Sequence, residues 1–294
     1  MPISLRTMRE DDISSAMELS SVANWNQTGE DWRRILHLSP EDCRCIEDGG
    51  KVAATATLLP YGTRLAWIGM VLTRPEYRRQ GLARQMMEDA ISRAEQRGIR
   101  TLKLDATEEG RPLYESLGFA VENKVERWGW DIGTLEFSAG KTPADEGPSE
   151  GPIDGTGISD DLRSMDAEAF GTGRMELLRM LSRSGGYSAT ANGYVFSRPG
   201  RLARYLGPCV ASSGAAARNM IARRLGVPRY LPGEHPGSES SPWFWDLLPA
   251  NAAAVDCAQM FGFTRCRELW RMRRGPEIAS NNAMIYAIAG FELG

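Results

Sequence analysis

Apolar residues recur at helical spacing along the first half of the chain. In residues 82–97, Leu82, Met86, Ala90 and Ala94 stand four positions apart, and Gly98 follows them. This pattern predicts an amphipathic helix that ends at a glycine. Further patterns predict helices over residues 11–23, 30–38 and 111–117 and strands over residues 3–8, 44–47, 52–59, 65–73, 102–106 and 119–130. The order β-α-α-β-β-β-α-β-α-β is typical of an α/β (α+β) fold with a mixed sheet.

The second half of the chain is predicted to repeat this order. Leu117-Gly118-Phe119 ends the short helix of the first half, and Phe261-Gly262-Phe263 stands at the same place in the second. This correspondence indicates an internal duplication of one α/β unit. The predicted helices cover residues 160–170, 175–182, 215–225 and 251–261, and the predicted strands cover residues 194–197, 202–211, 243–248 and 264–272.

A stretch of Gly, Pro, Ser, Thr and acidic residues separates the two halves. Residues 138–157 read SAGKTPADEGPSEGPIDGTG, with little that a core could bury. Such a composition predicts a flexible or extended linker. The expected organisation is a first domain over residues 1–137, the linker over residues 138–157 and a second domain over residues 158–294.

Charge is distributed unevenly over these parts. The 294 residues include 35 basic and 38 acidic side chains, a net charge of −3, and the hydrophobic fraction of 42% is ordinary for a globular protein. Residues 1–137 carry 18 basic and 22 acidic side chains, the linker 1 and 4, and residues 158–294 carry 16 and 12. Because a general nucleic-acid binder carries a basic excess, nucleic acid is not an expected partner.

The cysteines and the absence of long apolar runs indicate the compartment. There are five cysteines with no C-x-x-C pair and two histidines, so neither a metal site nor a disulfide framework is expected. Reduced thiols are typical of a cytoplasmic protein. The first residues, MPISLR, have no apolar signal core, and no apolar run approaches the roughly 18 residues of a membrane span. A soluble cytoplasmic protein without a membrane partner is therefore expected.

Residues 71–84, VLTRPEYRRQGLAR, place a basic loop with a glycine between a predicted strand and the long helix. The first amides of a helix lack intrahelical partners and lie at the positive end of its dipole, which favours a phosphate or pyrophosphate. Gly81 and Ala83 permit close approach, and Arg78, Arg79 and Arg84 add positive charge. The spacing fits neither the G-x-G-x-x-G nor the G-x-x-x-x-G-K-[ST] motif.

The loop resembles the R/Q-x-x-G-x-G/A motif of the GNAT acyltransferase superfamily. It reads Arg78-Arg79-Gln80-Gly81-Leu82-Ala83, and the second part of the family signature follows as residues 112–119, PLYESLGF. The first half is therefore similar to a GNAT domain, and the whole layout is similar to tandem GNAT proteins with one active half.

The resemblance implies acetyl-CoA as the cofactor and assigns roles to several residues. The loop that ends at Arg84 would hold the pyrophosphate, and backbone groups near Val71 and Thr73 would pair with the pantetheine arm, between two strands that diverge. Tyr114 would protonate the leaving thiolate, since the ordinary tyrosine pKa near 10 suits a general acid at neutral pH. The family often has Asn seven residues earlier, where this chain has Thr107, whose hydroxyl could contact the cofactor.

An amine acceptor must lose a proton before it attacks, so a base is expected near Tyr114. The candidates are Asp105, Glu108 and Glu109. Asp105 lies in a predicted strand and could equally be a structural residue. Glu108 and Glu109 could instead be the acidic first turn of the next helix; Glu109 is also a candidate for acceptor binding.

Aromatic residues next to carboxylates would suit a cationic or sugar-like acceptor. Trp25 and Trp32, around the first interhelical loop, and Trp245 with Asp246, in the second half, are candidates for substrate binding. For each tryptophan, packing in a core or an interface is the alternative.

In the second half, the position of the anion loop reads ASSGAA, without its arginines, and no tyrosine lies in residues 251–261. A degenerate copy that completes the substrate cleft is expected, with a weak second anion site as the alternative. Cys43 and Cys45 share one face of a predicted strand, and no histidine is placed to activate them, so they are expected to be structural thiols.

The resemblance therefore implies an N-acetyltransferase that transfers an acetyl group directly to a primary amine in a ternary complex. The acidic first half favours a small cationic acceptor. The layout is most similar to aminoglycoside 2'-N-acetyltransferases of the kasugamycin-modifying, antibiotic-resistance kind. The alternatives are acetylation of protein lysines or N-terminal amines, and a non-catalytic acyl-CoA-binding module. The sequence leaves the oligomeric state open.

Overall fold

Residues 3–130, 159–226 and 242–294 are described by the structure, a computed structural model. The chain divides into two units, each assembled from separate stretches. Unit 1 comprises Met1–Glu122, Trp270–Ile278 and Phe291–Gly294, and unit 2 comprises Asn123–Leu269 and Ala279–Gly290. The predicted linker over residues 138–157 lies outside the described residues, and the predicted domain boundaries stay a prediction.

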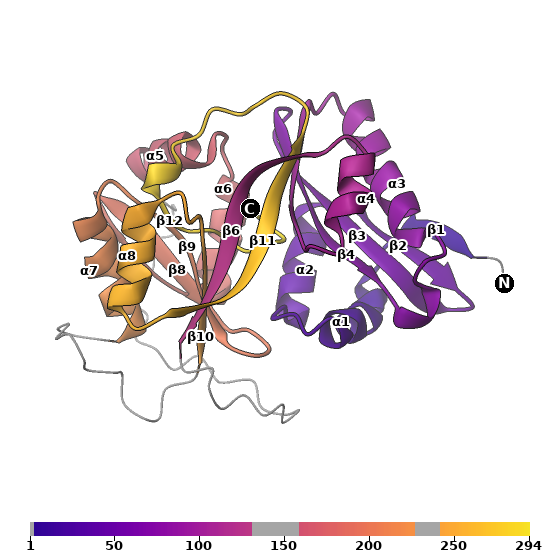
Figure 1. Cartoon of the computed structure of the whole chain (residues 1–294), viewed down its shortest axis with the longest axis horizontal. Helices are drawn as coiled ribbons and strands as arrows, with labels where there is room; N and C mark the ends of the chain where they lie inside the picture. Colours follow the sequence, from indigo (N-terminus) through magenta and orange to yellow (C-terminus); the bar gives the residue numbers. More distant parts are fainter. Residues whose placement is uncertain (1–2, 131–158, 227–241) are drawn as a thin grey trace. The chain divides into compact units, whose positions relative to one another are not determined.

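The first half has the predicted order of helices and strands, which Figure 1 follows by colour. All ten predicted elements are present, with short 3₁₀ turns added before α1 and α3. The elements are β1 (Ser4–Thr7), α1 (Ile13–Val22), α2 (Gly29–Leu38), β2 (Cys43–Asp48), β3 (Lys51–Tyr61), β4 (Leu65–Thr73), α3 (Leu82–Gln96), β5 (Thr101–Ala106), α4 (Arg111–Ser116) and β6 (Ala120–Trp130).

The sheet of unit 1 runs β1-β2-β3-β4-β5, with antiparallel neighbours up to β4 and a parallel β4–β5 pair. Alternate residues of β4 point to opposite faces. Ala66 and Ile68 pack with Met87 and Ala90 of α3. Trp67, and the residues two positions before and after it, therefore face the other side of the sheet. The helix α3 packs against one face only.

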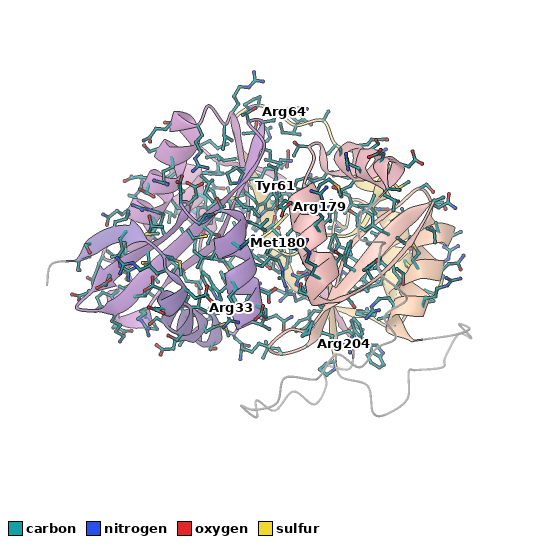
Figure 2. The ribbon with its side chains drawn as sticks, turned by 180° about the vertical axis from the view of Figure 1, so that it is seen from behind. Arg33, Tyr61, Arg64, Arg179, Met180 and Arg204 are labelled. Atoms are coloured by element: carbon teal, nitrogen blue, oxygen red, sulfur yellow. The ribbon has the colours of Figure 1, made fainter. Side chains whose placement is uncertain are left out.

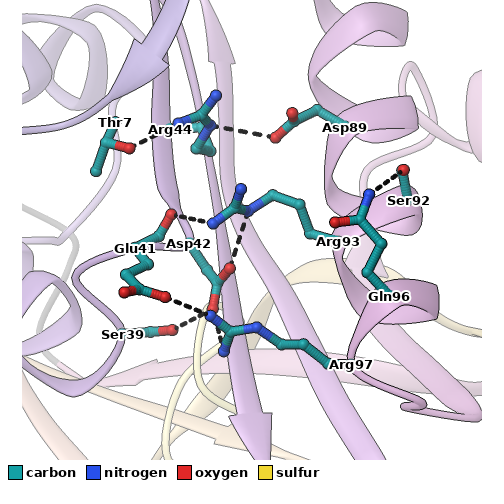
Figure 3. A network of polar contacts seen from close by, with 10 residues as sticks. All are labelled: Thr7, Ser39, Glu41, Asp42, Arg44, Asp89, Ser92, Arg93, Gln96 and Arg97. Atoms are coloured by element: carbon teal, nitrogen blue, oxygen red, sulfur yellow. Dashed lines mark hydrogen bonds and ion pairs between the residues drawn. The ribbon is translucent and has the colours of Figure 1, made fainter.

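An ion-pair network fastens α3 to the α2–β2 turn and to β2 (Figure 3). The carboxylate of Asp42 is inaccessible to solvent and accepts from Arg93 Nε at 2.9 Å and Arg97 Nη1 at 2.7 Å. Ser39 donates a further hydrogen bond to it at 3.0 Å. Nearer the start of the helix, Arg44 of β2 pairs with Asp89 of α3 at 3.3 Å. The orientation of α3, and with it the preceding loop, is fixed by these contacts as well as by the core.

The second half has the same order of elements after its first helices. In unit 2, β7, β8 and β9 form an antiparallel meander, β10 pairs with β9 in parallel, and β12 pairs with β9 in antiparallel fashion. The elements are α5 (Asp160–Phe170), α6 (Met175–Ser184), β7 (Gly186–Thr190), β8 (Gly193–Arg198), β9 (Arg204–Ala211), α7 (Gly214–Leu225), β10 (Trp243–Leu247), α8 (Ala252–Met260), β11 (Thr264–Arg274) and β12 (Ile285–Ala287).

Two strands of the second half, β7 and β12, have no counterpart among the predicted elements. β7 reads GYSAT, with an exposed end and no clear alternation. A Cβ on Gly186, its first residue, would clash with the Arg224 guanidinium, so a larger residue there would require that side chain to move. β12 is only three residues long. Both strands form because they pair with neighbouring strands, and the local pattern of apolar residues does not predict them.

Each unit takes one strand from the other half of the sequence. In unit 1, residues Trp270–Arg274 of β11 pair with Leu102–Ala106 of β5. In unit 2, residues Glu126–Trp130 of β6 pair with β10. The duplicated halves therefore exchange their last strands, a feature that periodicity along the chain does not report.

Candidate active site

The parallel strands β4 and β5 of unit 1 begin as neighbours and then diverge. Their pairing joins only Leu65 to Thr101, Ala66 to Leu102 and Trp67 to Lys103. β5 continues along β11 up to Ala106, whereas no strand in the described parts of the chain pairs with this edge of β4 beyond Trp67. Unpaired strand-edge groups can hydrogen-bond an extended ligand. Val71 and Thr73, predicted to hold the pantetheine arm, lie on this stretch of β4.

A bulge interrupts β4 in the same stretch. The register between β3 and β4 shifts between Thr55 and Thr57, and Met70 adopts a left-handed φ of 51°. The hydroxyl of Thr55 donates to the Met70 carbonyl at 2.8 Å, which stabilises this costly conformation. A bulge re-aims the backbone. Nothing in the local sequence predicts it.

The predicted anion loop leads from β4 to α3. Arg79 and Gly81 have positive φ values, 61° and 83°, and Gly81 is the residue before the helix, with no described side chain capping its first amides. The side chains of Arg78, Arg79 and Gln80 are exposed, and a Cβ on Gly81 would meet no described atom within 4 Å. The loop therefore presents uncapped amides and positive charge in open space.

The remaining residues of the motif support this arrangement. Leu82 is buried against β2 and β3, and Ala83 is half-buried. Arg84 is exposed and donates to the hydroxyl of Ser116 on α4 at 2.8 Å. Leu82 thus anchors the helix, while the arginine stays at the surface.

Tyr114 on α4 is buried, and its ring packs edge-on against Phe119 at 6.3 Å between centroids. Its hydroxyl has no hydrogen-bond partner among the described residues, and burial raises the pKa of Tyr114 to about 12. Gly110 makes room for the ring, because a Cβ there would lie 3.0 Å from Tyr114 Cε2 and 3.4 Å from Thr107 Oγ1. Thr107 accepts a hydrogen bond from the Gly110 amide at 3.2 Å. The hydroxyl of Thr107 therefore lies in the turn before α4, and that of Tyr114 lies on α4 itself.

Asp105 is held by Arg271. Both of its oxygens accept hydrogen bonds from the guanidinium, at 2.9 Å each, and its carboxylate is inaccessible to solvent. The Arg271 guanidinium also lies 4.6 Å from the ring centroid of Trp67. Because both oxygens are used in a buried ion pair, the structure favours the structural alternative for Asp105.

Glu108 and Glu109 follow β5 at the surface. Glu108 accepts a hydrogen bond from the Trp270 indole at 2.6 Å, and Arg111 lies over the Trp270 ring at 4.9 Å. Glu109 is exposed. These carboxylates lie in the turn between β5 and α4 and not in the first turn of the helix, which was the alternative for them. Glu108 is positioned by a tryptophan from the exchanged strand.

The aromatic candidates of unit 1 differ in exposure. Trp32 is 2% exposed and donates its indole N–H to Ser20 at 3.0 Å, so it is a core residue. Trp25 is half-buried in the α1–α2 loop. Only Trp25 of this pair retains surface for a ligand.

The candidates of unit 2 are fully buried. Trp245 donates its indole N–H to the Tyr286 carbonyl at 2.7 Å and packs edge-on with Phe263. Asp246 is paired with Arg127 through two hydrogen bonds of 2.7 Å. Trp245, Asp246 and Trp32 are therefore not carried into the site that we propose, because their polar groups are already satisfied inside a core.

The position in unit 2 that corresponds to the divergent β4 and β5 is filled by the chain itself. β9 and β10 also pair over three residues, Arg204 to Leu206 with Trp243 to Trp245, and then diverge. β12 lies between them: Ile285 and Ala287 pair with Val210 and Cys209, and the Ile288 amide donates to the Asp246 carbonyl at 2.9 Å. A Cβ on Gly207 would clash with the Ile288 carbonyl oxygen. In unit 2, β12 thus pairs with the strand that corresponds to β4, whose edge is left unpaired in unit 1.

The cysteines are poorly suited to nucleophilic catalysis. Burial raises the pKa of Cys43 to about 12 and that of Cys45 to about 11. In unit 2, burial raises the pKa of Cys257 to about 12 and raises that of Cys266. A thiol is nucleophilic as its thiolate, so these residues remain inert near neutral pH.

Two kinds of feature are absent from the described residues. None of their helices is long and apolar enough to span a bilayer. No group of three or more His, Cys, Asp or Glu side chains among them is placed to hold a metal ion.

Comparison with known proteins identifies the class. The sequence pattern of the acetyltransferase (GNAT) family matches residues 7–119, and that of an acetyltransferase (GNAT) domain matches residues 162–287. With the mixed-sheet fold, these matches define a protein with two GNAT domains in tandem. The chain belongs to the GNAT acetyltransferases and is a GNAT-type N-acetyltransferase.

Two relatives illustrate the range of matches. The uncharacterized N-acetyltransferase YitH of Bacillus subtilis is 27% identical over 245 residues, which cover 78% of this chain and 82% of that protein. Glucosamine 6-phosphate N-acetyltransferase of Trypanosoma brucei brucei is 28% identical over 141 residues, 42% of this chain and 94% of that enzyme. The first match spans most of both chains, and the second corresponds to a single domain.

Solved structures share the fold over nearly the whole chain. A candidate acetyltransferase from Pyrococcus horikoshii superposes with a TM-score of 0.79 at 18% identity, covering 99% of this chain and 96% of that one. A GCN5-related N-acetyltransferase from Sphaerobacter thermophilus gives 0.63 at 13% identity, covering 95% and 98%.

Acetyl-CoA is the cofactor of GNAT enzymes and of this protein. The residues present fit it: unit 1 has an unpaired strand edge on β4, and the loop after β4 leads to uncapped helix amides with exposed arginines beside them. The helix amides and arginines suit a pyrophosphate, and the unpaired strand edge suits an arm that contains amides.

Proposed function

We propose that the protein acetylates a primary amine of a small cationic molecule, and that an aminoglycoside such as kasugamycin is the acceptor. The observation that carries the proposal is the unpaired edge of β4, which leads to the loop, while Glu108 and Glu109 follow the neighbouring parallel strand β5. The acidic first half supports a cationic acceptor. The relative from Trypanosoma brucei brucei, named for a phosphorylated amino sugar, supports an amino-sugar acceptor.

In this proposal the loop and β4 bind the cofactor. The amides of Gly81, Leu82 and Ala83, with Arg78, Arg79, Gln80 and Arg84 nearby, hold the pyrophosphate. Backbone groups at Val71 and Thr73 hold the pantetheine arm, and Thr107 contacts the cofactor from the turn after β5. When bound, acetyl-CoA supplies an activated acetyl group as a thioester.

Tyr114 is proposed as the general acid. With the pKa raised by burial to about 12, its hydroxyl stays protonated at neutral pH and can donate to a leaving thiolate. Glu108 and Glu109 attract the cationic acceptor from the surface, and Trp25 provides an aromatic face. Transfer is direct, and the reduced cysteines support a cytoplasmic reaction.

The test is a screen of amines with the purified protein and acetyl-CoA. Kasugamycin, other aminoglycosides, glucosamine, polyamines, amino acids and peptides are incubated separately, and thiol release and the mass of each product are followed. We expect acetylation of an amino sugar at the highest kcat/KM. Acetylation of peptides alone would support the protein-acetylating alternative, and cofactor binding without transfer to any amine would support a binding module.

A further inference from the structure

Two helices of unit 2, α7 and α8, lie side by side over the same core, and their first turns meet (Figure 1). A Cβ on Gly214, the first residue of α7, would lie 4.0 Å from the Cβ of Ala253 in the first turn of α8. The first amides of a helix lack intrahelical partners and lie at the positive end of its dipole. Two positive helix ends therefore come together at the surface of unit 2.

The capping side chains leave the first amides of α7 free. Ser213 accepts a hydrogen bond from the Ala216 amide at 3.3 Å, and Asn251 caps α8 in the same way. The hydroxyl of Ser213 thus satisfies the third amide of α7. No described residue accepts a hydrogen bond from the amides of Gly214 and Ala215, so both can donate to an anion.

Tyr286 of β12 points into the same place. It is 3% exposed, and its hydroxyl oxygen would lie 3.5 Å from a Cβ on Gly214. The hydroxyl has no hydrogen-bond partner among the described residues, and it is not one of the enclosed polar atoms, so an ion can reach it from solvent. Burial raises the pKa of Tyr286, which keeps the hydroxyl protonated near neutral pH and able to donate.

Arg218 supplies a full positive charge. It follows Gly214 by one turn of α7, and its Nη1 would lie 3.5 Å from a Cβ on that glycine. The side chain is exposed and forms no ion pair or hydrogen bond with a described residue. Arg179 of α6, labelled in Figure 2, instead pairs with Glu176 at 3.5 Å. The guanidinium of Arg218 is therefore available to a ligand.

Asp256 of α8 is the acidic side chain to be considered near this place. Burial raises the pKa of Cys257 to about 12, and the charge of Asp256 acts in the same direction while that of Arg218 opposes it. Both charges therefore lie near one thiol, yet Asp256 is exposed and forms no ion pair with Arg218. The arginine is not neutralised by a direct contact with this carboxylate.

The arrangement suits a small anion with several oxygens. A Cβ on Gly214 would meet its neighbours at 3.5 Å or more, so this point has room for a further atom, and the exposed Arg218 and Ala253 border it toward solvent. Donors reach it from α7 and from β12, which matches the oxygens of a phosphate group. An extended arm like that of CoA does not fit, because β12 pairs with β9 at Cys209 and Val210.

We propose that the first turn of α7, with Arg218 and Tyr286, binds a phosphate group, either inorganic phosphate or the phosphate of a small monoester. The amides of Gly214 and Ala215, the guanidinium and the hydroxyl all donate to its oxygens. The site is separate from the loop after β4 and takes no part in acetyl transfer. It therefore does not depend on the identity of the amine acceptor.

The test is calorimetry of the full chain with inorganic phosphate. Because the loop after β4 also attracts anions, one titration uses wild type saturated with CoA, and a second uses Gly81→Asp without CoA, in which that loop carries a negative charge. We expect saturable binding of one phosphate per chain. Absence of saturable binding in both titrations would overturn the inference and leave the proposed function untouched.

Three variants and two matched controls locate the bound phosphate. Tyr286→Phe removes only the hydroxyl and should raise the Kd for phosphate at least fivefold, and Arg218→Gln should raise it at least tenfold. Gly214→Ala fills the open point with a methyl at ordinary contact distances, so it should fold normally and bind at least tenfold more weakly. The controls are Arg223→Gln, at the end of the same helix, and Gly173→Ala, whose methyl meets no described atom within 4 Å. Both should match wild type.

Thermal unfolding confirms that the variants fold and provides a second readout of binding. Phosphate should raise the Tm of wild type, and it should raise that of Tyr286→Phe less, because a ligand stabilises in proportion to its affinity. A phosphate Kd that is unchanged in Gly214→Ala, or unchanged in both Tyr286→Phe and Arg218→Gln, would overturn the inference.

The choice of anion tests the chemical class. Acetate that binds as tightly as phosphate would overturn the assignment to phosphate. Glucose 6-phosphate distinguishes the two sources of the group: tighter binding than inorganic phosphate supports a monoester as the ligand, and weaker binding supports the free ion.

Discussion

Arg271 holds both oxygens of Asp105 at 2.9 Å, and unit 2 contains the same pair in Arg127 and Asp246, at 2.7 Å. The two arginines stand at equivalent positions, each eight residues after the phenylalanine of the repeated Gly-Phe ending. Both arginines are on the exchanged strands, β11 and β6. The duplication therefore preserves a buried ion pair that fastens each exchanged strand.

Asp105→Asn should reduce stability rather than turnover. The substitution leaves the Arg271 charge buried with a neutral partner, so we expect the free energy of unfolding to fall by about 2–3 kcal/mol. The kcat of the folded fraction should stay within threefold of wild type. Urea unfolding and steady-state kinetics measure the two effects. A large fall in kcat at unchanged stability would restore Asp105 as the candidate base.

Asp246→Asn should behave in the same way in unit 2. Asp246 is inaccessible to solvent and paired with Arg127, so we expect a loss of about 2–3 kcal/mol in the free energy of unfolding. The acceptor KM should remain unchanged, since the carboxylate has no surface to offer a ligand. An increase in acceptor KM without destabilisation would instead support a substrate-binding role.

Tyr114→Phe should lower kcat by about 10²- to 10⁴-fold, the usual contribution of a general acid. The KM for acetyl-CoA should change little because the ring and its packing remain. The control is Tyr77→Phe, which removes the hydroxyl of a half-buried tyrosine in the turn before the loop. Tyr61→Phe is not used as the control. Equal losses in kcat and in CoA affinity would indicate a packing role.

The raised pKa of Tyr114 predicts its pH behaviour. Between the unfolded pKa near 10 and the folded pKa of about 12, the folded state retains a proton that the unfolded state has lost. The stability associated with this group is therefore full below pH 10 and is lost as pH rises toward 12. Wild type should lose stability more steeply than Tyr114→Phe in this window, as alkaline unfolding curves would reveal. Parallel curves would contradict the pKa shift.

One CoA should bind per chain. In unit 1 the β4 edge is unpaired beyond Trp67, and in unit 2 β12 occupies the corresponding position. Gly81→Asp places a negative charge at the anion loop and should weaken CoA binding at least 30-fold in calorimetry. Ser213→Asp is the matched control, because it adds the same charge before α7 and can still cap the helix. A stoichiometry of two would show that unit 2 also binds.

Alkylation of thiols should leave transfer intact. Since burial raises the pKa of Cys43 to about 12 and of Cys45 to about 11, iodoacetamide at pH 7.5 should alter kcat less than twofold. Mass spectrometry of enzyme quenched during turnover should find no acetyl thioester. An acetylated cysteine formed at the rate of turnover would replace direct transfer by an acyl-enzyme.

Local sequence determined a large part of this molecule. The spacing of Leu82, Met86 and Ala90 predicted α3, and Arg78 and Gly81 predicted the anion loop, because side-chain periodicity and conformational preference act over a few residues. The repeated Gly-Phe endings revealed the duplication for the same reason.

Tertiary structure decided which of the candidate carboxylates and tryptophans are available. Asp105 and Trp32 lie on elements that were correctly predicted, yet their partners, Arg271 and Ser20, come from other strands and helices. Burial and pairing depend on contacts between distant positions, which no local pattern contains.

What the sequence alone determined, then, is the class of fold, its duplication and a loop able to bind an anion. Three features are decided only in the tertiary structure. The last strands of the two halves are exchanged, β12 lies between β9 and β10 in the second copy, and Glu292 contacts Gln27, 265 positions away in the sequence. The physical reason is the distance along the chain over which each interaction acts. Hydrogen bonds within helices and turns join residues that are close in sequence. A binding site forms where two strands diverge, and whether their backbone groups stay unpaired depends on segments that are distant in sequence.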